Sequence, residues 1–138
     1  MRRVLGSHAD RIYAIFRIVV GFLFACHGAQ KLFGAFGGQP VQIASLMGLA
    51  GIIEFFGGVL VMIGLFTSWA AFIASGMMAV AYFKVHAPGG FFPIINRGEM
   101  AVAYCFIFLF MVFYGSGRFS LDSLLFRRRD AVAVPPAA

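Results

Sequence analysis

Residues 47–66 of this chain read MGLAGIIEFFGGVLVMIGLF, and residues 68–85 read SWAAFIASGMMAVAYFKV. Glu54 is the only charged residue in the first run, and the second run has none before Lys84. Each run is close to the roughly 20 apolar residues that a membrane-spanning helix needs. Neither run carries the polar stripe of a soluble surface helix. Because only Thr67 separates them, we expect two antiparallel transmembrane helices.

Two further apolar runs flank this pair. The first covers residues 12–33, and a shorter, phenylalanine-rich run covers residues 98–115. Strands are excluded, because lipid cannot satisfy the edge groups of an open sheet. The sequence therefore predicts an all-α fold, in which one domain over 1–126 forms a four-helix transmembrane bundle. We expect helices over about 12–33, 47–66, 68–86 and 98–115, and then a basic, Ala/Pro-rich tail over 127–138.

The composition supports a membrane protein. The 138 residues are 62% hydrophobic and 12% charged, whereas soluble domains are about a quarter charged. A domain this short leaves much of its surface in water, so this composition argues against a soluble enzyme. The formal net charge is +6, but the bases lie mostly at the chain ends beside apolar runs. This placement favours a bilayer partner over nucleic acid.

The distribution of basic residues predicts the orientation of the bundle. Four spans place both chain ends on one side of the membrane. That side carries Arg2, Arg3, Arg11, Arg118 and the arginines at 127–129, and the other side carries Lys31, Lys84 and Arg97. By the positive-inside rule, both termini are cytoplasmic. We expect a multi-pass protein of the bacterial inner (plasma) membrane.

Polar residues of all four predicted helices converge in the outer half of the bundle. On the first helix His27, Gln30 and Lys31 share one face, because residues three and four apart are neighbours. Glu54 lies about 10 Å from the outer start of the second helix, at 1.5 Å per residue. The remaining outer candidates are Tyr82, Lys84, His86, Arg97 and Glu99. Arg17 is the exception, because it lies toward the cytoplasmic side.

Glu54 is the most informative of these residues. Gly51 and Gly58 lie about one turn to either side of it, and small residues at this spacing allow a second helix to approach closely. A buried carboxylate must be protonated or paired, because burial disfavours its charged form. Candidate partners are Lys31, His27 and Lys84. We interpret Glu54 and His27 as catalytic candidates and the other outer groups as ligand-binding candidates. The alternative is an internal ion pair that only locks the helices together.

The histidines and cysteines give only weak indications of a haem, metal or redox site. His27 and His86 lie on different helices at the outer side, an arrangement that would suit axial haem ligation. We expect neither haem nor a metal site, because no Cys-x-x-Cys-His motif or dense ligand spacing is present. Cys26 and Cys105 have similar predicted depths. We interpret them as two apolar thiols, with a redox pair as the alternative.

Four motifs in chain order resemble the DoxX family. They are Arg17-x-x-x-Gly21-x-x-Phe24-x-x-His27-Gly28-x-x-Lys31-Leu32, Glu54-x-x-Gly57-Gly58-x-x-x-x-x-Gly64-Leu65-x-Thr67, Asn96-x-Gly98-Glu99 and Gly115-x-Gly117-Arg118-x-Ser120-Leu121-Asp122. The resemblance covers residues 13–125. Arg97 departs from the pattern, because glycine often stands at this position in such sequences.

The resemblance implies a four-helix inner-membrane protein with redox-linked biology. Relatives include a subunit of a thiosulfate:quinone oxidoreductase, and others are linked to quinone stress and oxidant detoxification. Quinone is accordingly the cofactor or substrate that the resemblance implies. It also implies a soluble or membrane-bound redox partner.

Three functions remain open from the sequence. The first is a subunit of a quinone-linked oxidoreductase. Its outer cluster carries one more cation than anion when the histidines are neutral, and would hold a quinone head or a sulfur oxyanion. The second is a binding or transport protein for a small hydrophobic or anionic molecule, which would be a homodimer with Arg17 on a path through it. The third is a non-catalytic scaffold subunit.

Overall fold

The computed structural model describes residue 6 and residues 8–126, and these residues form helices joined by short loops. The long helices are α2 (Ala9–Phe33), α3 (Leu46–Ile63), α4 (Thr67–Ala81) and α6 (Glu99–Tyr114). The short elements are η1 (Ala35–Gly37), η2 (Tyr82–His86), η3 (Ala87–Gly89), α5 (Pro93–Asn96) and α7 (Leu121–Leu125). The described residues include no strand, so the all-α prediction is confirmed. The predicted tail lies outside the described residues.

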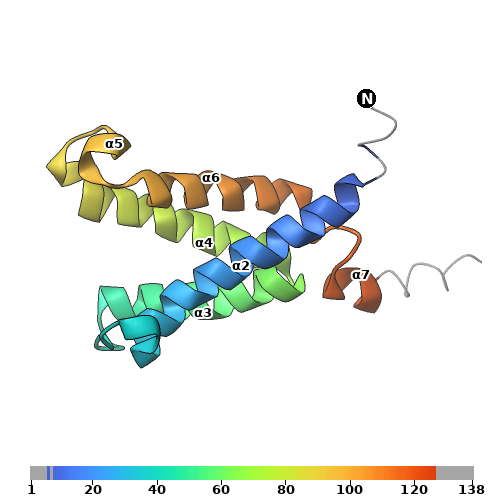
Figure 1. Cartoon of the computed structure of the whole chain (residues 1–138), viewed down its shortest axis with the longest axis horizontal. Helices are drawn as coiled ribbons and strands as arrows, with labels where there is room; N and C mark the ends of the chain where they lie inside the picture. Colours follow the sequence, from blue (N-terminus) through green and yellow to red (C-terminus); the bar gives the residue numbers. More distant parts are fainter. Residues whose placement is uncertain (1–5, 7, 127–138) are drawn as a thin grey trace, which may run out of the picture.

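The long helices form two antiparallel hairpins, α2 with α3 and α4 with α6 (Figure 1). One end of the molecule, which we call the loop end, carries η1 and α5. The opposite end, which we call the terminal end, carries the α3–α4 turn, α7 and the start of α2. The two hairpins meet near the terminal end and diverge toward the loop end. The described chain therefore begins and ends on the same side of the bundle.

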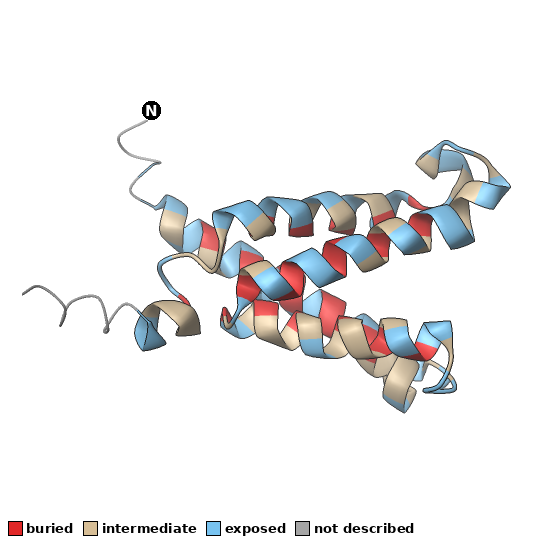
Figure 2. Ribbon diagram, turned by 180° about the vertical axis from the view of Figure 1, so that it is seen from behind, coloured by how far each residue is buried: buried red, intermediate tan, exposed pale blue. Residues whose placement is uncertain are grey.

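Three helical stretches within the described residues are long and apolar enough to cross a membrane. They are Ala9–Phe33, Leu46–Ile63 and Thr67–Gly89, the last of which continues from α4 through η2 and η3. Helix α6 is also apolar but has 16 residues. Figure 2 shows that the buried residues face the interior, whereas the outward faces are exposed. Exposed residues such as Trp69, Phe72 and Phe113 give these outward faces the apolar character that lipid contact requires.

Glycines allow α2 and α3 to pack with their backbones in contact. A Cβ atom at Gly28 would lie 2.2 Å from the Phe55 backbone nitrogen, and one at Gly58 would lie 2.5 Å from that of Ala25. Any side chain at these positions would push the helices apart. The predicted close approach at Gly51 and Gly58 is therefore present, and the helix that approaches is α2. This contact fixes the positions of the polar residues on both helices.

Helix α7 closes the terminal end by binding the turn between α3 and α4. The backbone nitrogen of Asp122 donates to the Gly64 carbonyl at 3.0 Å, and the Asp122 carboxylate accepts from the Phe66 nitrogen at 3.0 Å. Ser120 caps the helix, because its hydroxyl accepts from the Ser123 nitrogen. The sequence analysis did not predict this five-residue helix. The residues at its start, Ser120, Leu121 and Asp122, nevertheless belong to the last of the four motifs that resemble the DoxX family.

Candidate functional site

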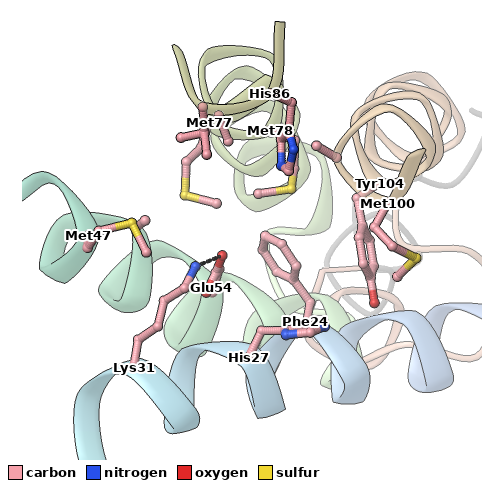
Figure 3. A pocket seen from close by; sticks show the side chains of 14 residues that line it. Phe24, His27, Lys31, Met47, Glu54, Met77, Met78, His86, Met100 and Tyr104 are labelled. Carbon is pink, nitrogen blue, oxygen red and sulfur yellow. Dashed lines mark hydrogen bonds and ion pairs between the residues drawn. The ribbon is translucent and has the colours of Figure 1, made fainter. Parts of the chain in front are cut away.

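A pocket of about 260 Å³ lies between the two hairpins in the loop-end half of the bundle. All four long helices and η2 contribute to its lining (Figure 3). The lining residues are Phe24, His27, Lys31, Met47, Ala50, Glu54, Met77, Met78, Ala81, Val85, His86, Met100, Ala101 and Tyr104. Most of these side chains are apolar. The pocket therefore combines an apolar wall with a few polar groups, as small-molecule sites do.

Lys31 and Glu54 form an ion pair in this pocket. The Lys31 Nζ atom lies 2.5 Å from Glu54 Oε1, and the two side chains are 24% and 4% exposed, respectively. The predicted pairing of Glu54 with Lys31 is present. The second carboxylate oxygen, Oε2, is buried and has no hydrogen-bond partner among the described residues. A buried acceptor without a partner is costly, so this oxygen is available to a bound group.

Aromatic side chains form the wall opposite the ion pair. Phe24 is 1% exposed and packs against Tyr104 and Phe108, with ring centroids 5.4 Å and 4.6 Å away. The His27 ring is edge-on to Tyr104, with a centroid separation of 6.4 Å. His27 itself is exposed. It therefore connects the pocket to the surroundings of the bundle.

His86 is held in place by the loop that follows it. Its Nδ1 atom lies 3.1 Å from the Asn96 carbonyl oxygen, which can only accept a hydrogen bond. Nδ1 therefore carries the ring proton in this structure, and Nε2 is left with a free lone pair when the ring is neutral. Asn96 also donates to the Tyr82 hydroxyl at 3.3 Å, and Tyr82 donates to the Phe91 carbonyl. This network fixes η2, a π-helical segment of the kind often found at functional sites.

The structure brings four of the predicted site residues into the pocket and leaves the others outside it. Those in the pocket are His27, Lys31, Glu54 and His86. Lys84, Arg97 and Glu99 are exposed, Gln30 packs against the α2–α3 loop at Gly38, and Tyr82 binds the loop before α5. The pocket therefore contains one lysine and one carboxylate. It carries no net charge when the histidines are neutral, in contrast to the positive cluster expected from the sequence.

Arg97 has a left-handed backbone conformation, with a φ angle of +59° at the end of α5. Glycine adopts this conformation without strain. The Arg97 side chain is exposed and does not reach the pocket.

Arg17 lies at the terminal end, and its residue is 2% exposed. It donates hydrogen bonds from Nη1 to the Val61 and Met62 carbonyls, at 2.6 Å and 3.0 Å, and from Nη2 to the Phe119 carbonyl at 2.8 Å. Val61 and Met62 belong to the last turn of α3, where a positive charge is favourable. Arg17 therefore joins α2 to α3 and to the segment before α7. These contacts give Arg17 a structural role at the terminal end.

Both cysteines are free thiols that are half-buried. Cys105 lies beside Ser75, whose hydroxyl donates to the Cys105 carbonyl at 2.9 Å. Neither cysteine lines the loop-end pocket. The interpretation as two separate apolar thiols fits this placement.

Sequence reasoning did not identify Tyr104 or the four methionines as pocket residues. In the middle of α6, Tyr104 is the hydroxyl-bearing side chain among several phenylalanines. This polar group in an apolar run was the sequence feature that could have indicated a site residue. The methionines are Met47, Met77, Met78 and Met100. Because methionine commonly fills gaps in cores, its pattern alone does not indicate a site.

The fold and the pocket define a helical membrane protein with a ligand-sized site between two hairpins, and comparison with known proteins gives its family. The DoxX family model matches residues 12–87, which include α2 from its fourth residue onward and all of α3, α4 and η2. The chain belongs to the DoxX family. The matched range includes the pocket residues of α2, α3, α4 and η2, and α6 lies outside it.

Two relatives extend the comparison over nearly the whole chain. An uncharacterized protein of Haemophilus influenzae is 42% identical over 131 residues, which cover 90% of this chain and 98% of the relative. An uncharacterized membrane protein of Mycobacterium tuberculosis is 29% identical over 147 aligned positions, which cover 94% of this chain and 90% of the relative. No solved structure matches the chain.

Proposed function

We propose that this chain is a four-span inner-membrane subunit of a quinone-linked redox system and that its loop-end pocket binds the quinone ring. Helix α6 is about 24 Å long at 1.5 Å per residue, somewhat short of a ~30 Å hydrocarbon core. Its pairing with α4 supports counting it as the fourth span. The positive-inside bias supports a cytoplasmic terminal end, which places the pocket in the outer half of the membrane.

The Lys31–Glu54 pair, in which the carboxylate is buried and the lysine is partly buried, is the observation that carries this proposal. A lone ion pair inside a membrane protein is costly, and such residues commonly mark functional sites. The pair lies in a pocket with apolar and aromatic walls, and Glu54 Oε2 has no partner there. An uncharged ring that carries oxygen groups would match both features, because a ring carbonyl oxygen can accept from Lys31 and a ring hydroxyl of the reduced form can donate to Glu54 Oε2. It would occupy the apolar space and also bring polar oxygens to the charged pair.

The size of the pocket supports a ring rather than a larger ligand. Its volume of about 260 Å³ is near the lower limit of small-molecule pockets, roughly 300 Å³. Met47, Val85 and Met100 are exposed residues that also line it. The pocket therefore borders the outward faces of the bundle. A prenyl tail would leave the pocket between the hairpins and remain in lipid.

The polar residues then have distinct roles. When bound, a quinone would supply two-electron, two-proton redox chemistry, and a redox partner subunit would exchange the electrons with it. The Lys31 ammonium would donate a hydrogen bond to a ring oxygen, and the Glu54 carboxylate would accept one from a ring hydroxyl of the reduced form and take up that proton when the ring is oxidised. His27, which is exposed at the pocket edge, passes protons between the surroundings and Glu54. Tyr104 and Phe24 hold the ring in position.

Two observations favour this function over the alternatives. The neutral pocket is a weak site for a sulfur oxyanion, which would require net positive charge. A transport path would use Arg17 at the inner side. The Arg17 guanidinium already donates hydrogen bonds to three backbone carbonyls. A scaffold role, in which the ion pair only fixes helix packing, is the alternative that experiment must separate from quinone binding.

The test is the affinity of the full chain in lipid nanodiscs for a short-chain ubiquinone in its oxidised and reduced forms. We expect Glu54→Gln to weaken binding of the reduced form by about tenfold or more, because the charge-assisted hydrogen bond from a ring hydroxyl to the carboxylate contributes roughly 1.5–3 kcal/mol. Glu99→Gln is the matched control, because Glu99 is exposed and does not line the pocket. We expect this control to bind as the wild type does.

A second variant separates binding from folding. Lys31→Met/Glu54→Gln removes both charges, and replacing a whole buried pair is often neutral for stability. We expect this variant to fold and to bind quinone as weakly as Glu54→Gln. A folded double variant with wild-type affinity would show that the pair is only structural, and the proposal would be wrong.

A further inference from the structure

The loop-end pocket is unusually rich in methionine sulfur. The chain has seven methionines, and four of them line this one pocket. They come from three helices, with Met47 on α3, Met77 and Met78 on α4, and Met100 on α6. Figure 3 shows the side chains of Met47, Met77 and Met78 extending into the same space, with the His86 ring beside Met78. The quinone proposal uses none of these sulfur atoms.

The chemistry of these groups points to one class of ligand. Thioether sulfur is an uncharged, soft donor that selects Cu(I) over hard or borderline divalent ions. Among the residues that the structure describes, no group of three His, Cys, Asp or Glu side chains comes together as a zinc or iron site would require. A monovalent ion also suits a pocket whose only carboxylate, Glu54, is already paired with Lys31.

The orientation of His86 is an independent observation that supports a metal ligand. Metal-binding histidines usually donate one ring N–H to a carbonyl or carboxylate, which fixes the tautomer and presents the other nitrogen. His86 has this arrangement, because Nδ1 is held by the Asn96 carbonyl at 3.1 Å. Its Nε2 lone pair is then available on a residue that lines the pocket.

We propose that Met47, Met77 and Met78, together with Nε2 of His86, form a binding site for Cu(I). Met78 is 8% exposed and lies deepest, whereas Met47 is 47% exposed and stands at the pocket edge. Met47 is therefore the first ligand that an entering ion meets. The network of Asn96 and Tyr82 keeps His86 in position behind the sulfur atoms. The ligand set includes neither Lys31 nor Glu54, although it lies in the same pocket.

The test is anaerobic competition for Cu(I) between the full chain in nanodiscs and a chromophoric chelator of known affinity. We expect the wild type to withdraw one Cu(I) per chain. Met47→Leu/Met77→Leu/Met78→Leu conserves side-chain volume and removes three ligands. We expect it to weaken binding by at least about 100-fold, because even groups behind the ligands contribute 10–100-fold. X-ray absorption of the wild-type complex should show sulfur and imidazole scattering.

Two controls make the result specific. Met62→Leu/Met111→Leu changes methionines outside this pocket, and we expect it to bind Cu(I) as the wild type does. Cys26→Ala/Cys105→Ala removes both thiols, and we expect it also to retain the ion. The proposal is overturned if the wild type does not compete with the chelator, if the triple variant keeps wild-type affinity, or if the cysteine variant loses the ion. An unfolding midpoint of the triple variant close to that of the wild type would show that the lost affinity is not caused by misfolding.

Discussion

Arg17→Met will destabilise the bundle by at least about 3 kcal/mol, because each hydrogen bond to a charged group contributes roughly 1.5–3 kcal/mol. The substitution removes three such bonds, and the Val61 carbonyl then keeps only the bond from the Gly64 nitrogen. Two of these carbonyls end α3, so the positive charge that favours that helix end is also lost. The expected result is a lower midpoint of unfolding and earlier proteolysis of the segment around α7.

The control for this prediction is Arg11→Met. Arg11 lies on the same helix but is exposed, and the same substitution is expected to change stability by less than about 0.5 kcal/mol. Arg17→Lys keeps the charge but loses the planar fork that reaches three carbonyls, so an intermediate loss is expected. Equal unfolding midpoints for Arg17→Met and Arg11→Met would contradict the structural role of Arg17.

Gly28→Ala will separate α2 from α3. The new Cβ atom would lie 2.2 Å from the Phe55 nitrogen and 2.6 Å from its Cα atom, and these backbone atoms cannot rotate away. Overpacking of this kind costs roughly 1–3 kcal/mol and more where backbone must move. The shift also displaces Lys31, which lies one turn further along α2, from Glu54. We expect both lower thermal stability in detergent and weaker ubiquinone binding.

Gly57→Ala is the matched control on the facing helix. A Cβ atom at Gly57 meets nothing within 4 Å, and alanine favours a helix over glycine by up to about 1 kcal/mol. This variant should therefore be as stable as the wild type or slightly more stable. If Gly28→Ala behaved like Gly57→Ala, the close contact between the helix backbones would be wrong.

The sequence was sufficient to predict the long helices, because apolar runs of this length have few alternatives. The helix predicted over 12–33 begins earlier, at Ala9, because Asp10 and Arg11 extend it beyond the apolar run. The helix predicted over 47–66 ends at Ile63, because Gly64 adopts a left-handed conformation and begins the turn. The short helices α5 and α7 were not predicted, since four or five residues show no periodicity.

The candidate site was predicted only in part. The ion pair between Lys31 and Glu54 could be inferred, because an intramembrane carboxylate needs a partner and few bases lay at its depth. Depth alone did not separate residues that face the interior from those that face outward. Lys84, Arg97 and Glu99 have the right depth but are exposed.

The most direct test of the quinone pocket is photolabelling of the full chain in nanodiscs with an azido-ubiquinone, followed by identification of the labelled residues by mass spectrometry. The account predicts labelling on Met77, Met78 and Tyr104, which line the pocket from α4 and α6. An excess of unlabelled ubiquinone should abolish this labelling, and Lys31→Met/Glu54→Gln should reduce it. Labelling confined to outward-facing residues such as Trp69 and Phe113, with no competition by ubiquinone, would contradict the account.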